Sequence, residues 1–183
     1  RDIDSDPGAQ HSLECASHLV VLQPQALRQL PARHRSRTRV IVQSASERAG
    51  MPAGPGTRFV AVGHLRAEKD PLTLMNAARL LRDTAGLHIA HIGAGLDEGL
   101  AAAARETMAA CPGYRWLGAL PHELARESIA GAHALVHPSR IEGGANVVIE
   151  AVRSGVPVIA SRIDGNVGLL GDRYEGFFAP GDA

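Results

Sequence analysis

The sequence predicts an α/β fold, a Rossmann-like parallel sheet with helices on both faces. The first observation is that short apolar runs alternate with helical segments through most of the chain. The second is that each apolar run is unbroken, as in strands that are buried on both faces. The third is that most runs end in glycine or a polar loop, and right-handed crossovers bring such loops to one edge of the sheet.

The composition supports a packed core and gives no sign of a charged partner. The chain has 183 residues, of which 45% are hydrophobic and only 3% aromatic, so aliphatic side chains must fill the core. The formal net charge of zero gives no support to nucleic acid or an acidic membrane as a partner. No apolar run reaches the length of a membrane span and no secretory signal is present. With two distant cysteines, Cys15 and Cys111, we expect a cytoplasmic protein.

Three regions are predicted along the chain. Residues 1–48 open with a polar lead-in and hold short strands at 19–22 and 40–42 around a helix at 25–30. Residues 49–56 are dense in glycine and proline and predict a linker. Residues 57–183 carry the regular alternation. Because the chain lacks an initial methionine and ends in a turn-like stretch, we expect a part of a longer protein.

The third region predicts four helices between five strands. Pro71 at a first helical position, Asp97 as an N-cap and Gly155 after a last turn support the helix boundaries. We expect strands at 59–62, 88–92, 114–117, 134–136 and 156–160, and helices at 71–82, 97–110, 121–130 and 146–153. The loops at the carboxyl ends of these strands should converge on one cleft.

The loop before the helix at 146–153 has the features of an anion site. Gly143 and Gly144 lead into this helix, and the first amides, those of Asn146 and Val147, have no partner inside it. These donors and the helix dipole favour a phosphate. A glycine pair can also serve only a tight turn, so the position at the end of a buried strand carries the prediction.

Two glutamates border the same predicted cleft, Glu142 in the loop and Glu150 about one turn into the helix. Carboxylates beside an anion site are expected where they accept hydrogen bonds from hydroxyls. A sugar nucleotide offers phosphates to the amides and hydroxyls to the carboxylates. The spacing alone occurs often by chance, so it acquires meaning only from its place in the fold.

Cationic residues are predicted at two places. Arg66 and Lys69 follow the strand at 59–62 and could hold a diphosphate opposite the helix amides. The alternative for Lys69, the only lysine in the chain, is an exposed residue paired with Glu68 or Asp70. The basic cluster at 33–39 is either a solvated turn or a phosphate contact.

Other sites find little support. Gly93 and Gly95 follow a strand as in half of a dinucleotide fingerprint, but the third glycine is missing, which disfavours NAD. His88 and His91 point to opposite faces of a strand, so no metal site is implied. His137 is interpreted as a core or turn histidine.

Several short motifs occur in an order that resembles one family. They lie at 63–71, 92–95, 116–118, 138–139, 142–150 and 155–160. The series resembles the donor-binding domain of retaining family-4 glycosyltransferases of the GT-B architecture, over most of residues 57–183. Residues 13–44 look like the last β-α-β part of the preceding acceptor domain. The wording at 142–147, 161–168 and 174–178 resembles the selenosugar synthase branch of selenoneine biosynthesis.

The resemblance implies roles for individual residues. Lys69 would neutralise the donor diphosphate, Glu142 and the backbone at 143–147 would orient the sugar and phosphates, and Glu150 would accept from the ribose. Trp116 and its neighbours would border the uracil. The implied catalytic residues are Lys69 and Glu142, and the implied donor-binding residues are Gly63, His64, Arg66, Gly93, Gly95, Trp116, Leu117, Gly143, Gly144, Ala145, Asn146, Val147 and Glu150.

The resemblance also implies a reaction. Members of that branch join a UDP-sugar, typically UDP-N-acetylglucosamine, to selenophosphate and need no bound metal or other cofactor. The acceptor would bind the N-terminal domain of the same chain, so we expect this part to bind UDP but to turn over poorly.

Two departures and two alternatives remain open. The family commonly has arginine where His64 stands, and many relatives have Gly-Phe-Gly where residues 143–145 read Gly-Gly-Ala, which leaves the donor sugar open. The alternatives are a family-4 enzyme with another NDP-sugar and a hydroxyl acceptor, and a non-catalytic nucleotide-binding α/β domain.

Overall fold

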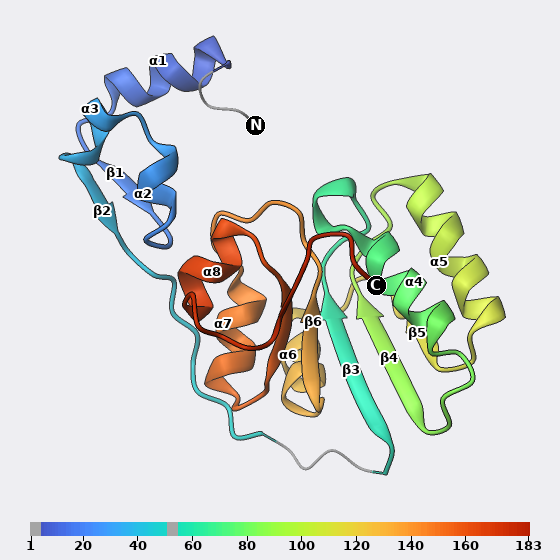
Figure 1. Cartoon of the computed structure of the whole chain (residues 1–183). Helices are drawn as coiled ribbons and strands as arrows, with labels where there is room; N and C mark the ends of the chain where they lie inside the picture. Colours follow the sequence, from blue (N-terminus) through green and yellow to red (C-terminus); the bar gives the residue numbers. More distant parts are fainter. Residues whose placement is uncertain (1–4, 51–54) are drawn as a thin grey trace.

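The computed structural model describes residues 5–50 and 55–183 (Figure 1). Two parallel sheets are present in these ranges, one of two strands and one of six. Part of the predicted linker at 49–56, residues 51–54, lies outside the described residues. The division into an acceptor-domain part, a linker and a donor domain therefore stays a prediction.

The smaller sheet pairs β1 (Leu19–Val21) with β2 (Thr38–Val40). Helix α1 (Pro7–Cys15) precedes it, and α2 (Ala26–Gln29) and α3 (Ala32–Arg35) connect its strands. The prediction that the first residues form only a lead-in was wrong, because the side chain of Asp6 accepts from the amides of Gly8 and Ala9 and caps α1. The strand expected at 40–42 lies two residues earlier.

Three arginines of the basic cluster at 33–39 donate hydrogen bonds within this small unit. Arg33 Nε donates to Glu14 Oε1 at 2.9 Å, and Arg37 donates to the carbonyls of Leu13 and Ala16 at 2.6 Å each. The guanidinium of Arg35 donates to the carbonyl of Leu30 at 3.0 Å. These contacts stabilise the turns around α3 and speak against a free phosphate site at these three arginines.

The larger sheet contains every strand that was predicted after residue 56. Its elements are β3 (Thr57–Val62), a 3₁₀ turn (Ala67–Lys69), α4 (Pro71–Leu80), β4 (Leu87–Ile92), α5 (Glu98–Ala110), β5 (Tyr114–Trp116), α6 (His122–Ala130), β6 (Ala134–His137), α7 (Asn146–Arg153), β7 (Val158–Ser161), α8 (Asp164–Leu170) and β8 (Phe177–Phe178). Helix α8 and strand β8 were not predicted. The strand expected at 156–160 begins at Val158, after a proline that has no N–H to donate.

The boundary signals explain why these helices begin and end where they do. Asp97 accepts from the amide of Leu100 at 3.0 Å and caps α5, and Pro71 starts α4. Gly155 follows α7 with a φ of 69°, a left-handed conformation that costs glycine little. The three predicted boundary residues are therefore confirmed.

Helices cover both faces of the six-stranded sheet (Figure 1). Side chains alternate along each strand, so Val60 packs with α6 and α7 while the next residue, Ala61, packs with α4 and α5. Leu135 of β6 and Met75 of α4 are fully buried on opposite faces. Two separate apolar clusters result, and the predicted α/β, Rossmann-like fold is confirmed.

The strand order sets where a ligand can bind. In the order β5-β4-β3-β6-β7-β8, the strands β3, β4 and β5 follow one another toward one edge of the sheet. The strands β6, β7 and β8 follow one another toward the other edge. The reversal lies between β3 and β6, which pair in parallel at Phe59–Ala134 and Val60–Leu135. Open parallel sheets bind ligands beyond the carboxyl ends of the strands at such a switch point.

The segment that joins the two sheets lies along α6 and α7. Arg48 pairs with Glu123 at 2.8 Å, Arg126 donates to the carbonyl of Ser46 at 2.7 Å, and Arg153 donates to Glu47 at 3.1 Å. A further contact joins the two units, because Gln29 of α2 donates to Asp164 of α8 at 3.0 Å.

Among the helices of residues 5–50 and 55–183, none combines the length and the apolar composition of a membrane span.

Candidate functional site

A cavity of about 440 Å³ opens at the switch point between β3 and β6, and we call it the switch-point cleft. The loops after β3, β4, β5 and β6 and the start of α7 contribute to it. Of the implied site residues, it is lined by Gly63, His64, Arg66, Lys69, Gly93, Glu142, Gly144, Ala145, Asn146 and Val147. The convergence that the sequence predicted is therefore present.

Lys69 and Glu142 meet inside this cleft. Nζ of Lys69 lies 2.5 Å from Oε1 of Glu142, and Nε2 of His137 lies 3.1 Å from the same oxygen, although off the direction of a straight hydrogen bond. Burial raises the pKa of Glu142, but the contacts from His137 and Lys69 outweigh it and bring the pKa to about 2. Glu142 is therefore ionised at neutral pH, and Lys69 does not pair with Glu68 or Asp70.

Further contacts join the loop that carries Lys69 to the loop that carries Glu142. The amide of Arg140 donates to the carbonyl of Glu68 at 2.8 Å, and its Nε lies 3.0 Å from Oδ2 of Asp70. Asp70 has a φ of 45°, unusual for a residue with a side chain, and also accepts from the hydroxyl of Thr73 at 2.9 Å. These contacts hold the strained turn that presents Lys69 to the cleft.

The N-terminus of α7 lies at the cleft, as the sequence analysis expected. Within the described residues, no side chain caps this helix, and its first turn contains no acidic residue. Ala145 is the buried N-cap, and the amides of Asn146 and Val147 begin the helix beside the cleft. Gly144 is also required for packing, because a Cβ there would lie 2.6 Å from Cβ of Leu22.

The glycines after β4 serve close packing between loops. A Cβ at Gly93 would collide with the carbonyl oxygen of Gly63, and a Cβ at Gly95 would lie 3.0 Å from the ring of Trp116. The indole Nε1 of Trp116 donates to the carbonyl of Gly93 at 2.8 Å. Trp116 therefore holds the loop after β4, and neither it nor Leu117 lines the cleft.

Glu150 lies just behind the cleft wall. It is a buried residue of α7, and its Oε1 lies 2.7 Å from Nε2 of His122, which does line the cleft. His64 accepts from the amide of Ala94 at 2.9 Å through Nδ1. Arg66 is exposed at the cleft edge, and no ion pair engages it in residues 5–50 and 55–183. Both side chains are exposed and line the cleft.

The sequence analysis did not predict some residues of the site. His137 was interpreted as a core or turn histidine, and it is indeed 2% exposed, yet it also contacts Glu142. His122 was not singled out, and Ala119 and Leu120 line the cleft where Trp116 was expected. The feature of the sequence that could have indicated His122 as a cleft residue is its position at the start of a helix that follows the end of a strand.

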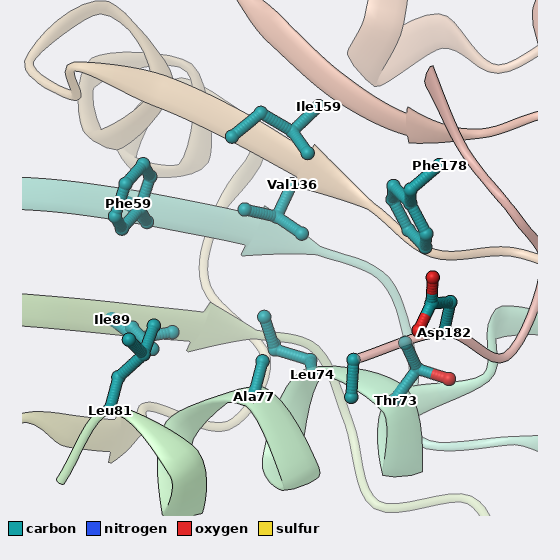
Figure 2. Close-up of a pocket in the computed structure, with 11 residues that line it drawn as sticks. Phe59, Thr73, Leu74, Ala77, Leu81, Ile89, Val136, Ile159, Phe178 and Asp182 are labelled. Carbon is teal, nitrogen blue, oxygen red and sulfur yellow. The ribbon is translucent and has the colours of Figure 1, made fainter. Parts of the chain in front are cut away.

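A second cavity, of about 350 Å³, lies on the face of the sheet that α4 covers only in part, and we call it the apolar groove (Figure 2). Phe59, Val136 and Ile159 line it from three neighbouring strands, and Leu74 and Ala77 line it from α4. It has no cluster of charges facing a common point. In the described part of the chain, no group of three or more His, Cys, Asp or Glu residues could hold a metal.

The fold and the switch-point cleft together define a class. A Rossmann-like parallel sheet carries, at its switch point, a lysine, a buried carboxylate and a helix N-terminus. Residues 56–183 match the family described as glycosyl transferases group 1. The chain therefore belongs to this family.

Solved structures with the same fold are glycosyltransferases of the GT-B architecture. Sucrose-phosphate synthase from Thermosynechococcus elongatus is 20% identical, with a TM-score of 0.78 over 100% of this chain and 51% of its own. The lipopolysaccharide outer core galactosyltransferase WaaB is 23% identical, with a TM-score of 0.70 over 98% and 53%. Anabaena HepE in complex with UDP is 14% identical, with a TM-score of 0.77 over 94% and 52%. This chain thus spans about half the length of each of these structures.

Proposed function

We propose that this chain supplies the donor half of a retaining GT-B glycosyltransferase that uses a UDP-sugar. The observation that carries the proposal is the Lys69–Glu142 pair at the switch point, beside the uncapped start of α7. A diphosphate needs cations and amide donors, and a sugar needs hydroxyl acceptors. The cleft brings both kinds of group within one cavity.

The chemistry follows from where negative charge develops. As the bond between the sugar and the nucleotide breaks, the departing UDP takes the electron pair. Lys69, Arg66 and the amides of Asn146 and Val147, which line the cleft, would meet that charge, so we propose that no metal ion is required. Glu142, held ionised by its neighbours, would accept from sugar hydroxyls and fix the sugar relative to the acceptor.

The finer proposal is that the donor is UDP-N-acetylglucosamine and the acceptor selenophosphate, whose selenium forms the new bond at the anomeric carbon. The support is the motif wording at 142–147, 161–168 and 174–178. Selenium is already a strong nucleophile, so little help from a general base would be needed. The acceptor would bind an N-terminal domain, of which residues 13–44 would be the last part.

Calorimetric titration of this chain with UDP tests the donor site. We expect binding by the folded protein, and Lys69→Ala should weaken it about tenfold to a hundredfold, because a charge-assisted contact contributes roughly 1.5–3 kcal/mol. Arg82→Ala, which removes an exposed cation beyond the C-terminal end of α4, is the matched control and should leave affinity unchanged. A folded protein that does not bind UDP would contradict the proposal.

The acceptor is tested with the full-length protein. Incubation with UDP-N-acetylglucosamine and either selenophosphate or an alcohol should release UDP only with selenophosphate. The selenium of the product should carry the sugar and the phosphoryl group, and hydrolysis of the P–Se bond by water then gives the free selenosugar and phosphate. A product only with the alcohol would replace selenophosphate by a hydroxyl acceptor and leave the glycosyltransferase proposal in place.

A further inference from the structure

His122 and Glu150 form a contact that the donor-site roles leave unexplained. Nε2 of His122 lies 2.7 Å from Oε1 of Glu150. The side chain of Glu150 is 9% exposed and that of His122 is 70% exposed. A nearly buried carboxylate is therefore reached from the cleft by a ring that is itself mostly in solvent.

The direction of this hydrogen bond follows from the chemistry of the two groups. A carboxylate oxygen accepts, so we take Nε2 of His122 as the donor to Oε1. Oε2 of Glu150 then remains as an acceptor. The hydrogen bond fixes the rotation of the carboxylate group, and thereby the direction in which Oε2 points.

The ring is itself held at the start of α6. His122 is the first residue of this helix, and its Nδ1 lies 3.9 Å from Oε1 of Glu123. Glu123 in turn pairs with Arg48 at 2.8 Å and approaches Arg126 at 3.7 Å. Carboxylates thus face both ring nitrogens, and two guanidinium groups hold the outer carboxylate in place.

We propose that His122 is a positioning residue for ribose recognition: it orients the carboxylate of Glu150 so that the free oxygen accepts from the ribose hydroxyls of the donor nucleotide. The inference rests on the proposed function, because it assigns a ribose to Glu150. His122 lines the switch-point cleft itself and so lies where a nucleotide would pass to reach Glu150.

If His122 had only a structural role, its removal would change stability rather than the recognition of ribose. A ring that is mostly exposed buries little apolar surface, so its removal should change the free energy of unfolding little. Removal instead leaves a nearly buried carboxylate without its donor and free to rotate. The effect should therefore appear in the recognition of ribose hydroxyls rather than in stability.

The test compares the affinity of the protein for UDP, 2′-deoxy-UDP and 3′-deoxy-UDP. We expect the unmodified protein to prefer UDP about tenfold over at least one deoxy analogue, as a hydrogen bond to a charged group allows. In His122→Ala this preference should fall to about twofold or less. His122→Gln, whose amide nitrogen can donate from a similar reach, should restore at least half of the lost preference.

His88→Ala is the matched control, because His88 is an exposed histidine of β4 outside the cleft. It should leave all three affinities unchanged. An unaltered preference in His122→Ala would overturn the inference, as would tighter UDP binding, which would mean that the ring occupies the ribose position. Absence of UDP binding by the unmodified protein would be the separate failure of the proposed function, and the inference would fall with it.

Discussion

The switch-point cleft and the apolar groove adjoin the same two strands, β3 and β6, yet they are built from different parts of them. The groove uses side chains on one face of the strands, such as Phe59 and Val136. The cleft uses the loops beyond the strand ends, which carry Lys69 and Glu142. The face of a strand is fixed by its alternation, whereas loops from distant parts of the chain meet only through the sheet topology.

The difference in polarity follows from these origins. Strand interiors of a parallel sheet are apolar because both faces are covered, so a gap in the cover exposes apolar side chains. The loops beyond the strand ends are not part of this apolar interior. They can therefore carry charged side chains and backbone amides that have no partner. We therefore expect substitutions in the groove to change stability and substitutions in the cleft to change ligand binding.

The largest expected effect is on stability where α4 lines the groove. Leu74 of α4 is 2% exposed, so Leu74→Ala should lower the free energy of unfolding by about 3 kcal/mol through lost burial and a new cavity. Leu80→Ala, on the same helix but 72% exposed, should change it by less than about 0.5 kcal/mol. Denaturant titration measures both. Under folding conditions, UDP affinity of Leu74→Ala should match the unmodified protein, and a tenfold loss would break the comparison.

A similar effect is expected from acid, through a histidine buried beneath the cleft. Burial lowers the pKa of His91 from 6.5 to about 4, and Nδ1 lies 2.9 Å from the hydroxyl of Tyr114. Between these values the unfolded chain binds a proton that the folded chain does not, so stability falls as the pH falls. The loss should reach about 3 kcal/mol at pH 4.

The control for this acid effect is His91→Gln, which can still bond to the hydroxyl of Tyr114 but does not titrate. Denaturant midpoints measured from pH 7 to 4 should fall less steeply in this variant than in the unmodified protein. Parallel curves would show that His91 does not cause the loss.

A smaller effect is expected from Glu142→Gln, which keeps the shape of the side chain and removes its charge. The preference for UDP-N-acetylglucosamine over UDP should fall about tenfold, because a neutral amide accepts more weakly from sugar hydroxyls. Affinity for UDP alone should not fall, because the variant keeps Lys69 and removes the carboxylate that competes with the diphosphate for it. Calorimetry measures both, with the exposed Glu106→Gln as control. An equal loss for both ligands would count against a role of Glu142 in holding the sugar.

The fold could be predicted largely from local pattern. Unbroken apolar runs and boundary residues such as Pro71, Asp97 and Gly155 act within a few residues of themselves, so β3 to β7 and the bounds of α7 were found. Strand β8 is only two residues long, and α8 has glycine at two of its seven positions. Short elements with weak propensity form here because tertiary contacts stabilise them, and no local pattern announces such contacts.

The candidate site could be predicted only where a residue type suggested a role. Lys69 and Glu142 carry opposite charges at the ends of two strands, and the topology brings such ends together. His122 contacts Glu150, 28 residues further along the chain, and His137 contacts Glu142 in the loop that follows its own strand, and no local motif indicates either contact. The resemblance implied that Trp116 borders the uracil, but Trp116 does not line the cleft, and its indole N–H donates to the loop after β4.

The smallest expected effect comes from the groove's outer wall. Ile159 of β7 is 37% exposed, so Ile159→Thr, which keeps a β-branched side chain, should lower the free energy of unfolding by only about 0.5–1 kcal/mol. UDP affinity should stay within twofold of the unmodified protein, because Ile159 points to the face of the sheet and the cleft lies beyond its edge. Paired denaturant and calorimetric titrations check this. A larger change in affinity would show that β7 transmits changes in the groove to the loop that carries Glu142, and the two cavities would then have to be treated as one coupled site.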